Sequence, residues 1–190
     1  MLFSEYIGNL NSTIELLDEK QITGFIDLIY KAYIEEKMVF VIGNGGSAAN
    51  ASHLAQDLAK GTRRNLAQIK RIKALSLTDN LPFITALGND DGYDTIFEQQ
   101  LITFANPGDI LICISGSGNS PNILKATKWA TEHKLITVGI TGFDGGELMK
   151  LCEHSVHVPL NNMFIVESIH SVIFHYILIE LNNILAKERL

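Results

Sequence analysis

Two short segments rich in glycine and serine have the composition of an anion-binding site. The first is Gly43-Asn44-Gly45-Gly46-Ser47 and the second is Ser115-Gly116-Ser117-Gly118-Asn119-Ser120; each follows an apolar run and leads into a helical pattern. Glycines let backbone N–H groups converge on an anion, the following helix N-terminus adds partial positive charge, and serines add neutral donors. Because parallel strands end at one edge of a sheet, the two segments predict one phosphorylated ligand held from both sides.

The first segment also fits, formally, the dinucleotide pattern G-x-G-x-x-A, with Gly43, Gly45 and Ala48. That pattern calls for an acidic residue at the end of the second strand, about 20 residues further on. Here the second strand-like run ends much later, at Leu77-Thr78-Asp79, and the dinucleotide reading gives no role to the second segment. Neither segment contains the Gly-Lys-Ser/Thr of a nucleotide-binding P-loop, so a phosphate cradle of another kind is favoured.

Side chains suited to proton transfer occur in two helical stretches. His53 and Asp57 are four residues apart and therefore share a helix face. Glu167, His170 and His175 lie in one very apolar stretch, where burial without partners is costly. Glu167 and His175 are about 80° apart around a helix, whereas His170 and His175 do not share a face, so one of these histidines points elsewhere. Imidazoles and carboxylates can move protons beside a carbonyl or hold a divalent cation.

The elements that must position these residues alternate along the chain. Helical patterns are predicted at 4–18, 20–36, 47–60, 81–104, 119–133, 145–152 and 162–186, and apolar strands at 38–42, 71–77, 109–114, 135–140 and 155–158. Fully apolar strands that alternate with helices indicate a parallel sheet covered on both faces. We expect an α/β fold, flavodoxin-like or Rossmann-like, with a five-stranded parallel sheet. Residues 1–36 form an N-terminal helix pair and residues 37–190 the α/β core with a long C-terminal helix.

Composition narrows the class of protein further. The 190 residues are 46% hydrophobic with a net charge of −6, which predicts one domain over residues 1–190 and no direct nucleic-acid partner. Cys113 and Cys152 have no CxxC spacing, as in a reduced, cytoplasmic protein. No signal peptide is apparent, and no apolar run approaches the ~20 residues of a membrane span. We therefore expect a cytoplasmic protein with no membrane partner.

The two segments above, together with Thr141-Gly142-Phe143-Asp144-Gly145-Gly146, resemble the sugar isomerase (SIS) family, in particular its phosphoheptose isomerase branch. The resemblance covers essentially the whole chain. It implies an aldose–ketose isomerase that converts sedoheptulose 7-phosphate to D-glycero-D-manno-heptose 7-phosphate, and a homotetramer with its sites between subunits. It implies phosphate binding by Ser47, Ser115, Ser117 and Ser120 with the backbone of Gly45, Gly46 and Gly116, and sugar hydroxyl contacts from Asn44 and Asp90.

The same resemblance assigns the catalytic residues and departs from the family pattern at three positions. Asp57 matches the catalytic glutamate and His175 the catalytic histidine; with His53 and Glu167 they match a set that holds zinc in some members. Aspartate replaces glutamate at 57, glutamate replaces glutamine at 167, and Gly116 stands where threonine is common. The substitutions favour a divalent cation, and either Asp57 or Glu167 is the catalytic base. The alternatives are an isomerase for another sugar phosphate or a non-catalytic assembly factor of the replication-initiator-binding type.

Overall fold

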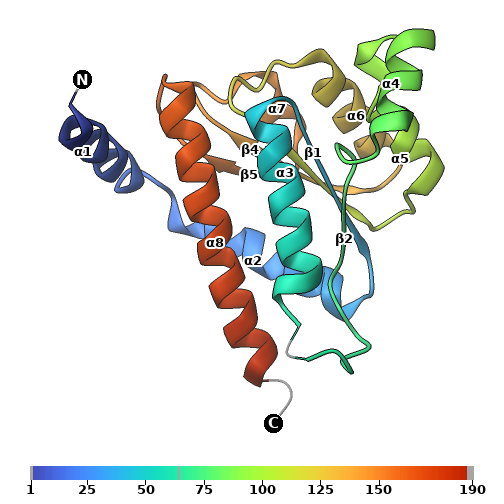
Figure 1. Cartoon of the computed structure of the whole chain (residues 1–190), viewed down its shortest axis with the longest axis horizontal. Helices are drawn as coiled ribbons and strands as arrows, with labels where there is room; N and C mark the ends of the chain where they lie inside the picture. The colour runs from blue at the N-terminus through green and yellow to red at the C-terminus, as the bar shows by residue number, and fades with distance from the viewer. Residues whose placement is uncertain (1, 64, 188–190) are drawn as a thin grey trace.

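A five-stranded parallel sheet lies at the centre of the computed structural model, which describes residues 2–63 and 65–187 (Figure 1). The strand order is β2-β1-β3-β4-β5, with parallel pairing throughout. The strands are β1 (Met38–Gly43), β2 (Lys73–Ser76), β3 (Ile110–Ser115), β4 (Ile136–Thr141) and β5 (His154–His157). This flavodoxin-like order puts β1 beside β3 at the point where the winding reverses, which is where open α/β sheets bind ligands. The predicted fold class is confirmed.

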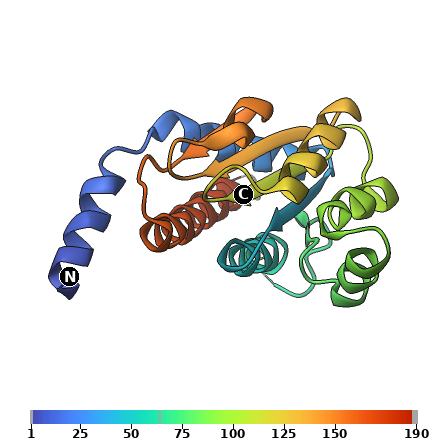
Figure 2. The same cartoon turned by 90° about the horizontal axis from the view of Figure 1, so that it is seen from above.

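Helices cover both faces of the sheet, as Figure 2 shows from above. The α-helices are α1 (Phe3–Ile14), α2 (Glu19–Ile34), α3 (Gly46–Gln56), α4 (Leu81–Asp90), α5 (Glu98–Phe104), α6 (Pro121–Glu132), α7 (Gly146–Leu151) and α8 (Met163–Lys187). Helices α2, α3 and α8 pack on one face, and α5, α6 and α7 on the other. Alternate strand residues supply the two cores: Val39 and Val41 face the first, whereas Phe40 and Ile42 face the second.

The single helix predicted over 81–104 is wrong, because the structure divides this stretch into three pieces. Helix α4 ends at Asp90, the 3₁₀ turn η2 (Tyr93–Thr95) follows, and α5 begins at Glu98. Gly92 has φ +97°, a backbone conformation that a helix interior does not allow and that glycine adopts without a Cβ penalty. The break turns Ile96 and Phe97 into the core on the α5–α6 side of the sheet.

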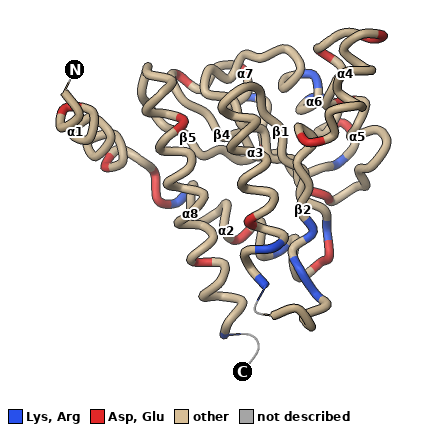
Figure 3. The backbone as a smooth tube through the Cα atoms, viewed as in Figure 1, with Lys and Arg blue, Asp and Glu red and all other residues tan. Residues whose placement is uncertain are grey.

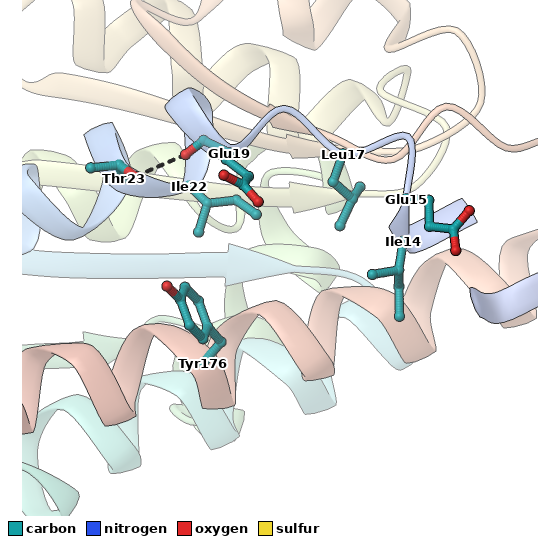
Figure 4. A pocket seen from close by; sticks show the side chains of 7 residues that line it. All are labelled: Ile14, Glu15, Leu17, Glu19, Ile22, Thr23 and Tyr176. Atoms are coloured by element: carbon teal, nitrogen blue, oxygen red, sulfur yellow. Dashed lines mark hydrogen bonds between the residues drawn. The ribbon is translucent and has the colours of Figure 1, made fainter. Parts of the chain in front are cut away.

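The N-terminal helix pair is divided between the core and the surface. Helix α2 buries Phe25, Ile26 and Ile29 against the sheet, whereas α1 extends away from the body of the domain and buries only Thr13 (Figure 2). Between the α1–α2 connection and α8 lies a cavity of about 390 Å³, into which apolar side chains of both segments point (Figure 4). It is lined by Ile14, Glu15, Leu17, Glu19, Ile22, Thr23 and Tyr176.

Helix α8 is long and apolar enough, by length and composition alone, to cross a membrane. The sequence expectation that no run approaches this length therefore needs qualification. In the structure, α8 packs against the sheet and α2 through residues such as Ile169, Ile173 and Ile177. A core helix of this kind meets the same criterion of length and hydropathy.

Candidate functional site

The two glycine-serine segments meet at the carboxyl ends of the adjacent strands β1 and β3. Together they line a cavity of about 290 Å³, here called the cradle. Its lining consists of Asn44, Gly45, Gly46, Ser47, Ile114, Ser115, Gly116, Ser117, Ser120, Met163 and Glu167. Helix α3 begins at Gly46 and α6 begins at Pro121, so the N-termini of two helices, with their partial positive charge, border the cradle. Ser120 precedes α6 and its hydroxyl makes no capping bond, which leaves it available to a ligand.

The serine segment is held in place by the loop after β4. The Gly142 N–H donates to the carbonyl oxygen of Gly116 (2.9 Å), and the Leu148 N–H donates to that of Gly118 (2.9 Å). Gly118 has φ +67°, and a Cβ there would overlap the backbone of Gly145. The third segment that the family resemblance singled out therefore acts as a brace for the cradle.

The two residues predicted to contact sugar hydroxyls, Asn44 and Asp90, differ in their distance from the cradle. Asn44 lines the cradle, but its amide exchanges two hydrogen bonds with Asn122 (2.9 and 3.0 Å) and accepts a third from the Tyr93 hydroxyl (3.0 Å). Asp90 is exposed at the end of α4, accepts a hydrogen bond from the Asn89 amide, and is not among the cradle residues. The structure thus places Asn44 at the cradle and Asp90 outside it.

A polar seam runs from the cradle along the contact between α3 and α8. On α3, residues 46, 50, 53 and 57 share one face by their spacing. The Ser171 hydroxyl donates to Asn50 Oδ1 (2.8 Å), and one α-helical turn further the rings of His53 and His175 lie 5.1 Å apart at 74°. His53 follows Gly46 by seven residues, about 10 Å along the helix. The seam also borders a second cavity of about 440 Å³, lined by Tyr6, Gly46, Asn50, Phe164, Glu167, Ser168 and Ser171.

His53, Asp57 and His175 meet at the far end of this seam. One ligand atom from each lies within 4.8 Å of the others, and His53 Nε2 is 3.3 Å from Asp57 Oδ2. The His53 side chain is 52% exposed and that of Asp57 22%, so an incoming ligand can reach both. Two imidazoles and one carboxylate are a donor set used at catalytic zinc sites, where a fourth position stays open. The residues present therefore fit a divalent cation.

The chain departs from regular helix at Asp57. The π-helical turn η1 (Asp57–Gly61) follows α3 directly, and the Thr62 hydroxyl closes it by donating to the Leu58 carbonyl (2.7 Å). A π-turn shifts the register of the side chains that follow it, and such turns occur often at functional sites. Sequence periodicity did not predict this turn, nor did it single out Asn50 and Ser171. Their spacing from His53 and His175, three and four residues, was the available signal.

Glu167 is not brought to the other three predicted metal ligands. It lies beside Gly46, where it lines both the cradle and the second cavity, about two turns of α3 away from His53. The residue is half-buried, and its carboxylate makes no hydrogen bond or ion pair with residues 2–63 and 65–187. The structure therefore brings together His53, Asp57 and His175 and leaves Glu167 at the phosphate end.

His170 points away from the site, as the helical spacing predicted for one of the two histidines. It is fully buried, and its Nε2–H donates to the Thr141 carbonyl oxygen (3.2 Å). Nδ1 is then unprotonated, and it has no partner among the residues the structure describes. Burial lowers the pKa of His170 to about 4, because charging a buried imidazole removes it from water.

This buried histidine predicts a loss of stability in mild acid. The unfolded state takes up a proton near pH 6.5, whereas folded His170 does so only near pH 4, so its contribution is present above pH 6.5 and lost as the pH falls toward 4. We expect the loss to be about 3 kcal/mol. Urea unfolding of His170→Gln between pH 7 and 4 should lack this part of the pH dependence, whereas the exposed His133→Gln should retain it. If the free energy of unfolding changes with pH equally in His170→Gln and wild type, His170 is not the source of the acid sensitivity.

Comparison with known proteins agrees with this architecture. The model of the SIS domain family matches residues 3–142. A phosphoheptose isomerase from Clostridium acetobutylicum is 39% identical over 158 residues, covering 83% of this chain and 79% of its own. One from Maridesulfovibrio salexigens is 35% identical over 150 residues, covering 78% and 70%.

Solved structures extend the likeness to nearly the whole chain. A phosphoheptose isomerase from Neisseria gonorrhoeae superposes with a TM-score of 0.85 at 28% identity, covering 95% of both chains. One from Francisella tularensis gives 0.86 at 27% identity, covering 95% of this chain and 94% of its own. From its cradle, its fold and these matches, the chain belongs to the SIS domain family, in the phosphoheptose isomerase branch.

Proposed function

We propose that this protein is a phosphoheptose isomerase that converts sedoheptulose 7-phosphate to D-glycero-D-manno-heptose 7-phosphate. One observation carries the proposal: the cradle, with its serine hydroxyls, and a His–Asp–His group occupy the two ends of one polar seam between α3 and α8. An isomerase needs both, because the phosphate must be anchored while a proton moves at the other end of the sugar. The relatives named above are phosphoheptose isomerases over most of this chain's length, which supports the same reaction here.

Phosphate recognition uses neutral donors. The hydroxyls of Ser47, Ser115, Ser117 and Ser120 and the N–H groups at the start of α3 would bind the phosphate oxygens. With the phosphate fixed, the open-chain sugar extends along the seam toward His53 and His175. The second cavity, with the Asn50 amide and the Ser171 hydroxyl, lies on this route and offers hydrogen bonds to sugar hydroxyls.

Proton transfer falls to the group at the far end. Asp57 removes the proton from the carbon beside the carbonyl, and His175 moves a proton at the neighbouring oxygen, which produces the enediol and then the isomeric carbonyl. Glu167 is the alternative base. A divalent cation, which we propose to be Zn²⁺, would be held by His53, Asp57 and His175 and would stabilise the enediolate oxygen.

A homotetramer is proposed from the apolar side chains left uncovered on α1 and α8. Phe3 and Phe164 are both 79% exposed, and Val172, Tyr176 and Ile179 form an exposed strip beside His175. Large exposed apolar patches next to a site mark interaction surfaces, and a second copy would cover both the strip and the His–Asp–His group. The free thiols Cys113 and Cys152 suit the cytoplasm, where we place the protein.

Turnover of sedoheptulose 7-phosphate, followed by NMR on chelated and on zinc-reconstituted protein, tests the proposal. We expect the aldose heptose phosphate to accumulate, with a rate that rises when zinc is restored. Conversion at the same rate with and without zinc would exclude a catalytic role for the cation. Acid–base catalysis by Asp57 and His175 would then account for the reaction. No conversion in either state would contradict the heptose assignment and favour another sugar phosphate or an assembly factor.

A further inference from the structure

The Glu167 side chain occupies the space that a side chain at Gly46 would need. Gly46 lies in the first turn of α3 without a positive φ, so its backbone would accept a side chain. The space that a Cβ would fill is instead taken by Glu167, both of whose carboxylate oxygens would lie closer than 3.0 Å to that Cβ. Gly46 and Glu167 are therefore a matched pair, and the carboxylate rests against the N-terminal turn of α3.

This position puts a negative charge inside the phosphate cradle. Glu167 is part of the cradle lining, and that lining includes no Lys or Arg among the described residues. Many of the Lys and Arg residues lie instead around β2 and the segment after α3 (Figure 3). A phosphate monoester carries about −1.5 to −2 charges at pH 7, and the positive end of α3 favours an anion of either kind. Carboxylate and phosphate thus compete for the same helix end and repel each other.

A second cavity beside the cradle is open to the Glu167 carboxylate. In the described part of the chain no donor is recorded for its oxygens, whereas the adjoining cavity of about 440 Å³ shares Gly46 and Glu167 with the cradle. In that cavity the Asn50 amide has a second N–H besides the one that donates to the Glu167 carbonyl oxygen (3.3 Å), and this N–H can donate to a carboxylate. The Ser168 hydroxyl donates to the Phe164 carbonyl oxygen (2.8 Å) and that of Ser171 to Asn50 Oδ1 (2.8 Å), so these two hydroxyls must turn before they can donate to it. Glu167 lines both cavities, so a change of side-chain rotamer is the movement that would carry the carboxylate from one to the other.

We propose that Glu167 is an internal competitor for the phosphate cradle, occupying it in the ligand-free protein and moving into the second cavity when a phosphate group binds. The inference rests on the proposed function, since it assumes that the cradle takes phosphate. It makes Glu167 a determinant of phosphate affinity in addition to any part in proton transfer. The carboxylate reaches the sugar side of the seam only once the phosphate end is filled.

The test is binding of inorganic phosphate at pH 7, measured by isothermal titration calorimetry. We expect Glu167→Gln, which keeps the shape and removes the charge, to bind phosphate with a Kd about tenfold lower than wild type. Glu180→Gln is the matched control, because it makes the same change on α8 about 20 Å further along the helix. Its Kd should equal that of wild type.

The outcomes separate this inference from the function on which it rests. Phosphate binding with equal Kd in wild type and Glu167→Gln, or weaker binding by the variant, would overturn the competition while leaving the cradle intact. No phosphate binding by any of the three proteins would overturn the proposed function as well. A crystal structure of the wild-type phosphate complex gives a second readout: Glu167 should lie beside Asn50 and Ser171, and a carboxylate still against Gly46 would contradict the proposal.

Discussion

Asp57→Asn is expected to lower kcat/KM for sedoheptulose 7-phosphate by about 10³-fold, within the range for loss of a general base. The amide cannot accept the proton, and it is a weaker partner than a carboxylate for His53 Nε2, which lies 3.3 Å from Asp57. The same change removes the only carboxylate within the His–Asp–His group of described residues, so zinc content after reconstitution should fall too. Turnover by NMR and metal analysis of the purified variant measure the two effects.

Asp27→Asn is the matched control for this variant. Asp27 is exposed on α2, so its replacement changes the net charge equally without touching the seam, and turnover should stay at the wild-type level. Activity of Asp57→Asn within tenfold of wild type would exclude Asp57 as the base and transfer that role to Glu167. In that case Glu167→Gln should show the large loss instead.

Gly118→Ala is expected to destabilise the protein by about 3 kcal/mol, as strained backbone and a collision with main chain act together. Gly118 has φ +67°, and its Cβ would overlap the carbonyl group of Gly145. The atoms that this Cβ would meet belong to the backbone of Gly145, so no side-chain rotation relieves the contact. The loop after β4 must therefore separate from the serine segment. Urea unfolding gives the stability change, and the phosphate Kd should rise in the same variant.

Gly88→Ala provides the comparison. Gly88 lies in α4 with open space around its Cβ position and no positive φ, so alanine should stabilise the protein slightly, by about 0.5–1 kcal/mol. An unfolding free energy for Gly118→Ala within 1 kcal/mol of wild type would show that the serine segment and the loop after β4 can move apart at little cost. The brace would then have no part in shaping the cradle.

The sheet was predictable because its strands are apolar on both faces and its ligand loops follow directly after them. Runs such as Ile110–Ile114 are short and apolar at every position, which is typical of buried parallel strands that alternate with helices. The helix predicted over 81–104 is wrong because the polar sequence Asn89-Asp90-Asp91-Gly92, which is typical of a turn, divides it, and Gly92 takes a positive φ there.

The sequence predicted the two ends of the site, the cradle and the His–Asp–His group, but not the polar seam that joins them. Spacing placed His53 with Asp57 on one face, and family resemblance added His175, which the structure brings to them. The seam between them depends on how α3 and α8 face each other. The Asn50–Ser171 pair, 121 positions apart in the chain, follows from that tertiary contact. The sequence likewise could not predict the position of Glu167, because it depends on the space that the missing side chain of Gly46 leaves free.

Helix α3 gives the proposed site a ruler. In the proposed mechanism one end of the helix would bind the phosphate, and its face presents His53 about 10 Å further on. The length of the substrate would then be compared with a fixed number of turns. A sugar phosphate with fewer carbons would leave its carbonyl short of the acid–base group, whatever the configuration of its hydroxyls. Selection by carbon number is therefore built into the backbone, and stereochemistry is left to the side chains along the way. Deletion of one residue from α3 would both shorten the ruler and rotate its far end by about 100°.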